Sequence, residues 1–147
     1  ALEPFEQENL EIMIDSVGMG AGCYDRLSEL GLPVRAINVS ESPSMKETYL
    51  NLRAELWFKT KAWLENRSCK IPKNDQLLSE LTSLRYTFTS SGKIKAESKQ
   101  DLKKRGFNSP DLADSLALTF SQEGATAMSG SFRQFRGELR RNLQGIA

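Results

Sequence analysis

The sequence predicts an α/β domain in which a central mixed β-sheet is flanked by helices. Three observations lead to this prediction. Two apolar segments between Leu10 and Val39 surround a glycine-rich turn and an amphipathic segment, which is the pattern of a strand–helix–strand unit. Two further strand-like segments surround a small glycine turn between Arg85 and Glu97. Helical patterns occupy the segments between and after these strands, as in domains where helices cover a sheet.

The strand–helix–strand unit begins with Leu10–Asp15, a short apolar strand that ends on an acid. A helix is expected over Cys23–Leu30, and Gly31 is a suitable residue to end it. The second strand is expected over Leu32–Val39. Because a helical connection joins parallel strands through a right-handed crossover, we expect these two strands to be adjacent and parallel.

Met45–Glu65 is the longest helix candidate, since its apolar residues recur near helical spacing; this stripe indicates a core rather than a ligand site. A helix is also expected over Asp75–Leu84, after a proline-containing breaker. The hairpin strands are predicted at Arg85–Thr89 and Lys93–Glu97. Lys99–Arg105 is predicted to form a short basic helix.

The last predicted helix begins at Ser109-Pro110-Asp111 and continues to about Phe120. Serine is a favoured N-cap, and proline suits the first helical turn. Residues 122–147 are rich in small polar residues and then in arginine, which predicts a flexible linker and a basic tail. We therefore expect one domain over residues 1–121, followed by that tail.

The composition excludes several kinds of chemistry. The chain has 147 residues and a net charge of +1, with 39% hydrophobic and 27% charged residues, as expected for a globular domain. No apolar run is long enough to span a membrane. Two cysteines do not predict a disulfide framework. The absence of histidine excludes histidine-based zinc sites and Ser-His-Asp triads, and no ATP-binding phosphate-loop motif occurs. Chemistry must therefore depend on carboxylates, lysines or hydroxyls.

Three aspartates are candidates for a metal site. Asp15 ends a predicted strand, whereas Asp111 and Asp114 lie three residues apart in the first turn of a helix and so share a face. Carboxylates from a strand end and a helix start can converge on Mg²⁺ or Mn²⁺, which prefer oxygen ligands. Structural explanations also exist, because the helix dipole favours acids in a first turn and an aspartate after a strand often stabilises a turn.

Basic residues are concentrated after the hairpin. Residues 93–105 contain six lysines or arginines and two acids. Such a cluster can bind the phosphates of a nucleic acid, or it can simply be a solvated face.

Several segments resemble one known family. They are IDSVGMGAGCYDRL (residues 14–27), NLRAELW (51–57), GKIKAESK (92–99) and SPDLADSLAL (109–118). In order and spacing they are similar to the nuclease domain of the large terminase subunit of tailed phages, over about residues 10–120. The last two segments together are the most specific match, and the first segment is close behind.

The resemblance implies a ribonuclease H-like fold with acids around two divalent metal ions, Mg²⁺ or Mn²⁺. Asp15 matches the family's second acid, Asp111 the acid at the start of the last helix, and Asp114 its close neighbour. The family's first acid lies on an upstream strand, and no such strand precedes Leu10 here. The sheet is therefore expected to lack its first strand or strands, and this N-terminally truncated chain to bind metal weakly and cut little alone.

The resemblance also implies a function. Lys93, Lys95 and Lys99 would hold the DNA backbone, with Lys99 approaching the cut phosphate, although a plain surface lysine is an equal alternative. The domain would cut concatemeric double-stranded DNA during viral genome packaging in the host cytoplasm. Its partners would be DNA, the small terminase subunit and the procapsid portal protein, with no membrane. The alternatives are another ribonuclease H-like nuclease, such as a resolvase or transposase, and a degenerate prophage remnant that acts as an interaction module.

Overall fold

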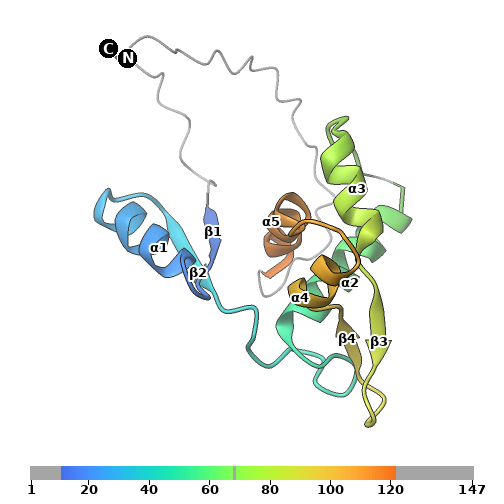
Figure 1. Ribbon diagram of the computed structural model, residues 1–147. Coiled ribbons are helices and arrows are strands. Elements are labelled where there is room, and N and C mark those ends of the chain that lie inside the picture. Colours follow the sequence, from blue (N-terminus) through green and yellow to red (C-terminus); the bar gives the residue numbers. More distant parts are fainter. Residues whose placement is uncertain (1–10, 68, 122–147) are drawn as a thin grey trace.

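The computed structural model describes residues 11–67 and 69–121, which form two small sheets and five α-helices (Figure 1). The elements are β1 (Ile12–Asp15), α1 (Gly20–Glu29), β2 (Val34–Ile37), α2 (Leu52–Glu65), α3 (Asp75–Ser83), β3 (Tyr86–Phe88), β4 (Ile94–Ala96), α4 (Lys99–Lys104), α5 (Asp111–Leu118) and the 3₁₀ turn η2 (Thr119–Ser121). Leu10 and the predicted tail over residues 122–147 lie outside the described residues. None of the described helices has the length and apolar character that a membrane crossing requires.

The predicted strand–helix–strand unit is confirmed. β1 and β2 pair in parallel, with Ile12 opposite Val34 and Asp15 opposite Ile37, and α1 packs against both. The helix begins at Gly20, three residues before the predicted start. A Cβ atom at Gly20 would lie only 1.7 Å from the carbonyl oxygen of Asp15, so only glycine allows the helix to start this close to the strand end.

The predicted hairpin is also confirmed, but the prediction of one central mixed sheet is wrong for the described residues. β3 and β4 pair antiparallel and form a sheet separate from β1 and β2. The free edge of β4 instead bonds to the segment before α2: Ile94 donates to the Thr48 carbonyl, and its own carbonyl accepts from Leu50. Helices α2 and α5 lie between the two strand pairs (Figure 1), since α5 contacts β1 and α2 contacts β4.

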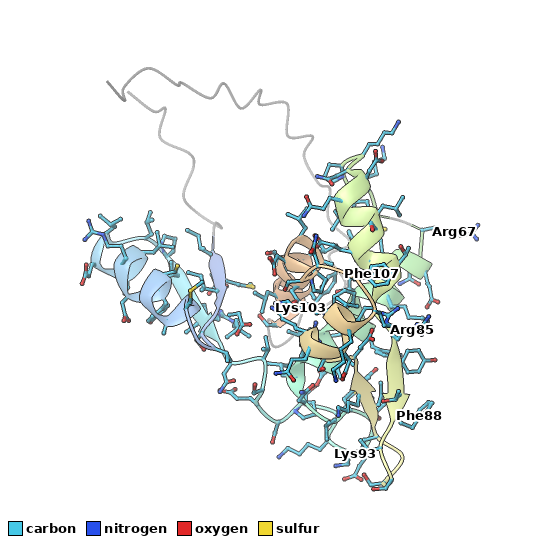
Figure 2. The ribbon with its side chains drawn as sticks, viewed as in Figure 1. Arg67, Arg85, Phe88, Lys93, Lys103 and Phe107 are labelled. Atoms are coloured by element: carbon cyan, nitrogen blue, oxygen red, sulfur yellow. The ribbon has the colours of Figure 1, made fainter. Side chains whose placement is uncertain are left out.

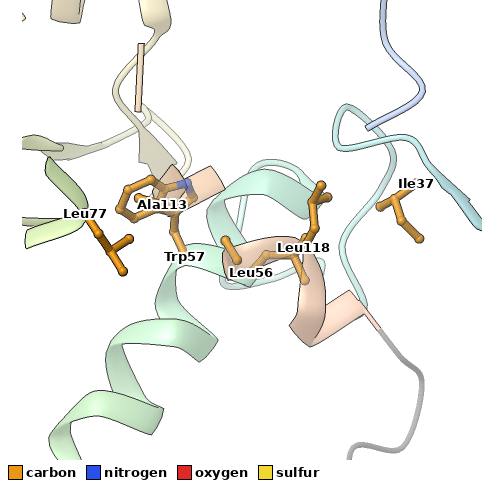
Figure 3. Packing of buried hydrophobic residues seen from close by; sticks show 7 residues of the cluster. Ile37, Leu56, Trp57, Leu77, Ala113 and Leu118 are labelled. Carbon is orange, nitrogen blue, oxygen red and sulfur yellow. The ribbon is translucent and has the colours of Figure 1, made fainter. Parts of the chain in front are cut away.

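The hydrophobic core forms where α2, α3 and α5 meet. Leu56 and Trp57 of α2 pack with Leu77 of α3 and with Ala113 and Leu118 of α5 (Figure 3). Ile37 extends this cluster to the end of β2. The apolar stripe of the long predicted helix is therefore core, as the sequence indicated, and it fixes the start of α5 against α2.

Two further helix starts also differ from the prediction. α2 begins at Leu52 rather than Met45, because the Asn51 side chain caps it by accepting from the Ala54 N–H. α5 has Pro110 rather than Ser109 at its N-cap position, with no cap from that residue's side chain. Instead Glu80 of α3 accepts a hydrogen bond from the Ala113 N–H at 3.0 Å. A side chain of a neighbouring helix therefore supplies the hydrogen-bond partner for a free N–H group in the first turn of α5.

An ion pair joins the base of the hairpin to α4. Arg105 donates through Nε and Nη2 to the two carboxylate oxygens of Glu97, at 2.7 and 2.6 Å, and through Nη2 to the Ser83 carbonyl. These bonds from Arg105 hold the pKa of Glu97 below its ordinary value, although burial opposes the shift. The hairpin, α3 and α4 are therefore fixed to one another by one guanidinium.

This pair predicts a loss of stability in acid. Because the pKa of Glu97 is lower in the folded state than in the unfolded state, its contribution is present above pH 4.5 and disappears as the pH falls through the folded-state pKa. Thermal melts between pH 7 and pH 3 should show a larger fall in Tm for the natural chain than for a Glu97→Gln variant, which starts lower at pH 7. Equal falls in the two proteins would contradict this contribution.

Candidate functional site

A cavity of about 50 Å³ lies where the end of β1, the helices α2 and α5, and the start of α4 come together. Its lining residues are Asp15, Val39, Arg53, Leu56, Trp57, Lys99, Asp114, Ala117 and Leu118. We call it the central pocket. Two of the three candidate aspartates, Asp15 and Asp114, line it together with the candidate lysine Lys99. Residues that are about a hundred positions apart in the sequence thus meet at one place.

Asp114 is the most strongly held of the three aspartates. Its Oδ1 accepts hydrogen bonds from Arg53 Nη2 at 3.1 Å and from Trp57 Nε1 at 2.8 Å. Lys99 Nζ lies 3.2 Å from Oδ2, so both carboxylate oxygens have partners. The side chain is 20% exposed. Asp114 is therefore arranged to fix the cations around it, and neither of its oxygens is left without a donor.

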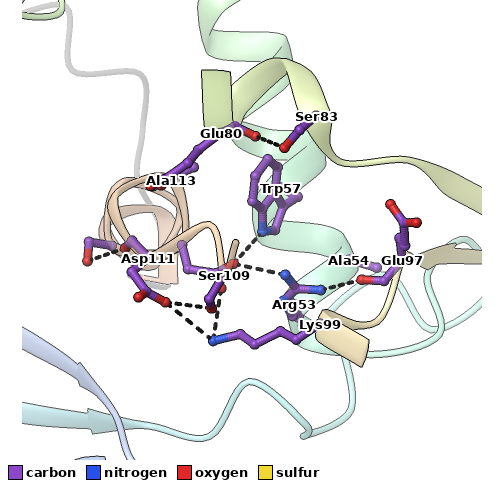
Figure 4. Close-up of polar contacts among 12 residues, drawn as sticks. Arg53, Ala54, Trp57, Glu80, Ser83, Glu97, Lys99, Ser109, Asp111 and Ala113 are labelled. Atoms are coloured by element: carbon purple, nitrogen blue, oxygen red, sulfur yellow. Dashed lines mark hydrogen bonds and ion pairs between the residues drawn. The ribbon is translucent and has the colours of Figure 1, made fainter. Parts of the chain in front are cut away.

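Arg53 and Trp57 lie one helical turn apart on α2 and present their polar atoms to Asp114. Arg53 also donates to the Glu97 carbonyl at 2.8 Å, which joins α2 to the end of β4 (Figure 4). Its Nε is the one buried side-chain nitrogen or oxygen without a hydrogen-bond partner among the described residues. The sequence interpretation missed both residues as site residues, although their spacing of four within NLRAELW was a usable signal.

Asp111 is far more accessible than its neighbour, with 76% of its side chain exposed. It starts α5, and its Oδ1 accepts from Ser109 Oγ at 2.6 Å. Lys99 Nζ lies 4.0 Å from the same oxygen and so stands between the two carboxylates of α5 (Figure 4). Oδ2 of Asp111 makes no hydrogen bond or ion pair with any of the described residues, which leaves this oxygen open to an approaching cation.

Asp15 ends β1, and its Oδ1 accepts from the Val17 N–H at 3.1 Å. The turn role expected of an aspartate after a strand is therefore present. The same side chain lines the central pocket. The turn bond and the helix start at Gly20 hold the Asp15 backbone in place beside that pocket.

The hairpin lysines, Lys93 and Lys95, do not line the central pocket as Lys99 does. Lys95 is on β4 opposite Thr87, and Lys93 is close to the turn of the hairpin (Figure 2). By strand alternation these two lysines share one face of the hairpin. Whether they continue to Lys99 as one basic surface stays a prediction.

The three candidate aspartates do not form a complete metal site among the described residues. Carboxylate oxygens of Asp15, Asp111 and Asp114 have the chemistry that Mg²⁺ and Mn²⁺ prefer. Among the described residues, however, no group of three acids is close enough to hold a metal ion. Mg²⁺ is commonly held by one or two carboxylates, waters and substrate phosphates. The described acids therefore do not by themselves form the predicted two-metal centre.

Comparisons with known proteins point to one fold. No protein-family model matches the chain, and no curated protein sequence matches it significantly. The solved nuclease domain of the large terminase subunit gp2 of bacterial virus Sf6 matches with a TM-score of 0.59 and 23% identity, over 73% of this chain. Lysine-to-alanine variants of that domain, solved with manganese and with calcium, match with TM-scores of 0.59 and 22% identity.

The chain spans 63% of the length of these solved domains. The identity is too low to carry more than the fold. That fold agrees with the mixed α/β arrangement of the described residues. The chain therefore has the fold of the nuclease domain of a phage terminase large subunit.

Proposed function

We propose that this chain is a metal-dependent endonuclease domain of a viral DNA-packaging terminase, which cuts concatemeric double-stranded DNA. The observation that carries the proposal is the central pocket, in which Asp15 from a strand end meets Asp114 and Lys99. The terminase nuclease fold supports it, and manganese and calcium are present in solved structures of that fold. The small terminase subunit, the procapsid portal protein and a place in the host cytoplasm follow as parts of the same proposal.

The residues divide into ligands and positioning groups. Asp15 and the exposed Asp111 would hold a divalent ion together with phosphate oxygens of the DNA. When bound, the ion supplies an activated water and stabilises charge on the phosphate. A second ion requires at least one donor from outside the described residues, such as the acid that the family carries on an upstream strand.

Asp114 would act through the cations that it holds. It keeps Arg53 and Lys99 beside the pocket, and Trp57 donates to the same carboxylate oxygen as Arg53. Lys99, with 47% of its side chain exposed, can move from the aspartates to a DNA phosphate. In this arrangement, Asp114 is a positioning residue and Lys99 contacts the substrate.

The hairpin lysines give a separate prediction on DNA binding. A Lys93→Glu, Lys95→Glu double variant should bind duplex DNA more weakly, since two phosphate contacts are lost. For the same reason, the slope of the logarithm of the binding constant against the logarithm of the salt concentration should become less steep by about 1.8. Fluorescence anisotropy between 50 and 200 mM salt measures both. The matched control is Lys70→Glu, Lys73→Glu, which reverses two exposed charges in the loop before α3. An unchanged slope in the hairpin variant would exclude the hairpin as a phosphate contact.

The two alternatives predict different observations. A resolvase- or transposase-type nuclease with this fold would prefer branched DNA or specific ends over plain duplex. A degenerate remnant would bind DNA or protein but never cut. The coding sequence upstream of Ala1 distinguishes these alternatives from a terminase at low cost. If the protein is a terminase, that sequence should encode an ATPase with a phosphate loop, followed by a strand that carries an acid.

Cutting itself is tested by incubating supercoiled plasmid and Mn²⁺ or Mg²⁺ with a form of this chain that is extended by the proposed upstream strand and its acid. The proposal predicts nicked and then linear plasmid, and full inhibition by EDTA. Intact plasmid with every divalent metal, from a folded protein that binds DNA, would favour the degenerate alternative.

A further inference from the structure

Four aromatic rings form a continuous row on the side of the hairpin away from the hairpin lysines. Tyr49 contacts Phe58 with ring centroids 5.6 Å apart, Phe58 contacts Tyr86 at 5.1 Å, and Tyr86 contacts Phe88 at 5.9 Å. We call these residues the aromatic row. The last two contacts are close to perpendicular, an arrangement that aromatic rings favour. The row thus runs from α2 outward along β3.

The outer half of the aromatic row is open to solvent. Tyr86 is 52% exposed and Phe88 is 65% exposed, although both belong to a regular strand. Phe88 projects away from β3 in Figure 2, and Lys93 lies on the other side of the hairpin. The inner rings, Tyr49 and Phe58, are partly buried and hold Tyr86 in place. Two preoriented rings therefore present free surface at the end of a supported row.

The charges around the row indicate what could cover it. The exposed charged residues of the hairpin are the cations Arg85 and Lys95, and Lys93 is partly exposed. The hairpin's acid, Glu97, is 11% exposed and is neutralised by Arg105. Lys61 lies three residues after Phe58 on α2, so the two side chains share a face of that helix, and the Lys61 ammonium pairs with Glu65 at 2.6 Å. Exposed rings on one face of a hairpin whose other face carries lysines suit a polyanion that carries flat bases.

We propose that the aromatic row binds unpaired DNA bases, with Tyr86 and Phe88 stacking on consecutive bases while Lys61 and the hairpin lysines neutralise the backbone. Stacking of bases on exposed rings is sequence-tolerant and requires the base faces to be free, as in an opened or frayed duplex. The inference rests on the proposed function, and it specifies that the hairpin binds DNA whose bases are unpaired. In this arrangement one face of the hairpin contacts phosphates and the other face holds bases that have left the duplex.

The test compares three fluorescein-labelled probes in EDTA, so that no cutting occurs: a 15-residue oligo-dT, the same backbone with abasic sites, and a blunt duplex. A Tyr86→Ala, Phe88→Ala variant should bind oligo-dT on the order of a hundredfold more weakly, at about tenfold for each ring. Its affinity for the abasic strand and for the blunt duplex should be unchanged. Equal loss on the abasic strand, or no loss on oligo-dT, would overturn the inference.

Matched variants separate stacking from folding and from protein docking. Phe88→Tyr should retain oligo-dT binding, whereas Phe88→Leu, which stays apolar, should lose it. Phe107→Ala removes a ring that is 40% exposed and packs on Arg105 outside the row, and it should bind like the natural chain. Circular dichroism checks that each variant is folded. If oligo-dT binding is unchanged while Tyr86→Ala, Phe88→Ala abolishes self-association, the row is a protein interface and the inference fails.

Failure of this inference leaves the proposed function standing. In that case the Lys93 and Lys95 variants still weaken duplex binding, and plasmid is still cut with Mn²⁺. If the proposed function is wrong, the plasmid stays uncut, whether or not the Tyr86 and Phe88 variants change oligo-dT binding.

Discussion

Replacing Asp114 with alanine is expected to lower the free energy of unfolding by about 3 kcal/mol, because it removes the common partner of several buried donors. Arg53 is 15% exposed and Asp114 is 20% exposed, so solvent replaces little of what is lost. Trp57 Nε1 and Arg53 Nη2 would both lose their acceptor. Urea unfolding followed by tryptophan fluorescence measures the change, and Trp57 itself reports on this part of the structure.

The control for this prediction is the neighbouring acid. Asp111→Ala removes a carboxylate that is 76% exposed, and its effect on stability should stay within about 0.5 kcal/mol. Asp114→Asn keeps an oxygen that can accept from Arg53 and Trp57, and should therefore cost less than Asp114→Ala. Equal destabilisation by Asp111→Ala and Asp114→Ala would contradict the different environments of the two side chains.

The sequence predicted the local elements of this fold better than their assembly. Strand alternation, glycine turns and cap residues are local signals, so the parallel β1–β2 pair and the antiparallel hairpin were predicted correctly. The single central sheet was not, because β4 satisfies its free edge with the backbone around Tyr49, a contact between distant segments. The predicted N-cap of α5 was wrong for the same reason, since the acceptor for the Ala113 N–H is Glu80 on another helix.

Part of the predicted set of site residues lies around the central pocket, and whether these residues form a metal site stays a prediction. The convergence of Asp15, Asp114 and Lys99 on one pocket agrees with their strand-end, helix-start and basic-segment positions. The sequence could not distinguish Asp111 from Asp114, because residues three apart share a helix face whatever lies opposite. The structure separates them through Arg53 and Trp57, which contact Asp114 alone of the two.

Replacing Asp111 with asparagine is expected to abolish metal-dependent cutting while leaving the fold intact. The exposed carboxylate of Asp111 is the acid of α5 most accessible to a cation. Asparagine keeps the size and an oxygen but removes the charge, and loss of several kcal/mol of charge stabilisation corresponds to a rate decrease on the order of a hundredfold or more. The matched control is the Asp75→Asn variant, which changes an exposed aspartate at the first position of α3 and should cut DNA at the normal rate.

The 147-residue chain itself is expected to cut little, because among its described residues no three acids come together around one ion. Weak metal binding would appear as a small rise in Tm with Mn²⁺. Efficient cutting by this chain alone would mean that Asp15, Asp111 and Asp114 are not the whole acid set.

The most direct test of the account is therefore a plasmid assay with Mn²⁺ on a form of this chain extended by the proposed upstream strand and its acid, with Asp111→Asn and Asp75→Asn run beside it in the same extended form and DNA binding measured for all three. The account predicts that the unsubstituted extended chain and Asp75→Asn linearise the plasmid, and that Asp111→Asn binds DNA without cutting it. Cutting by Asp111→Asn at the unsubstituted rate would contradict the assignment of the site, and an unsubstituted extended chain that binds DNA but leaves it intact would contradict the nuclease function.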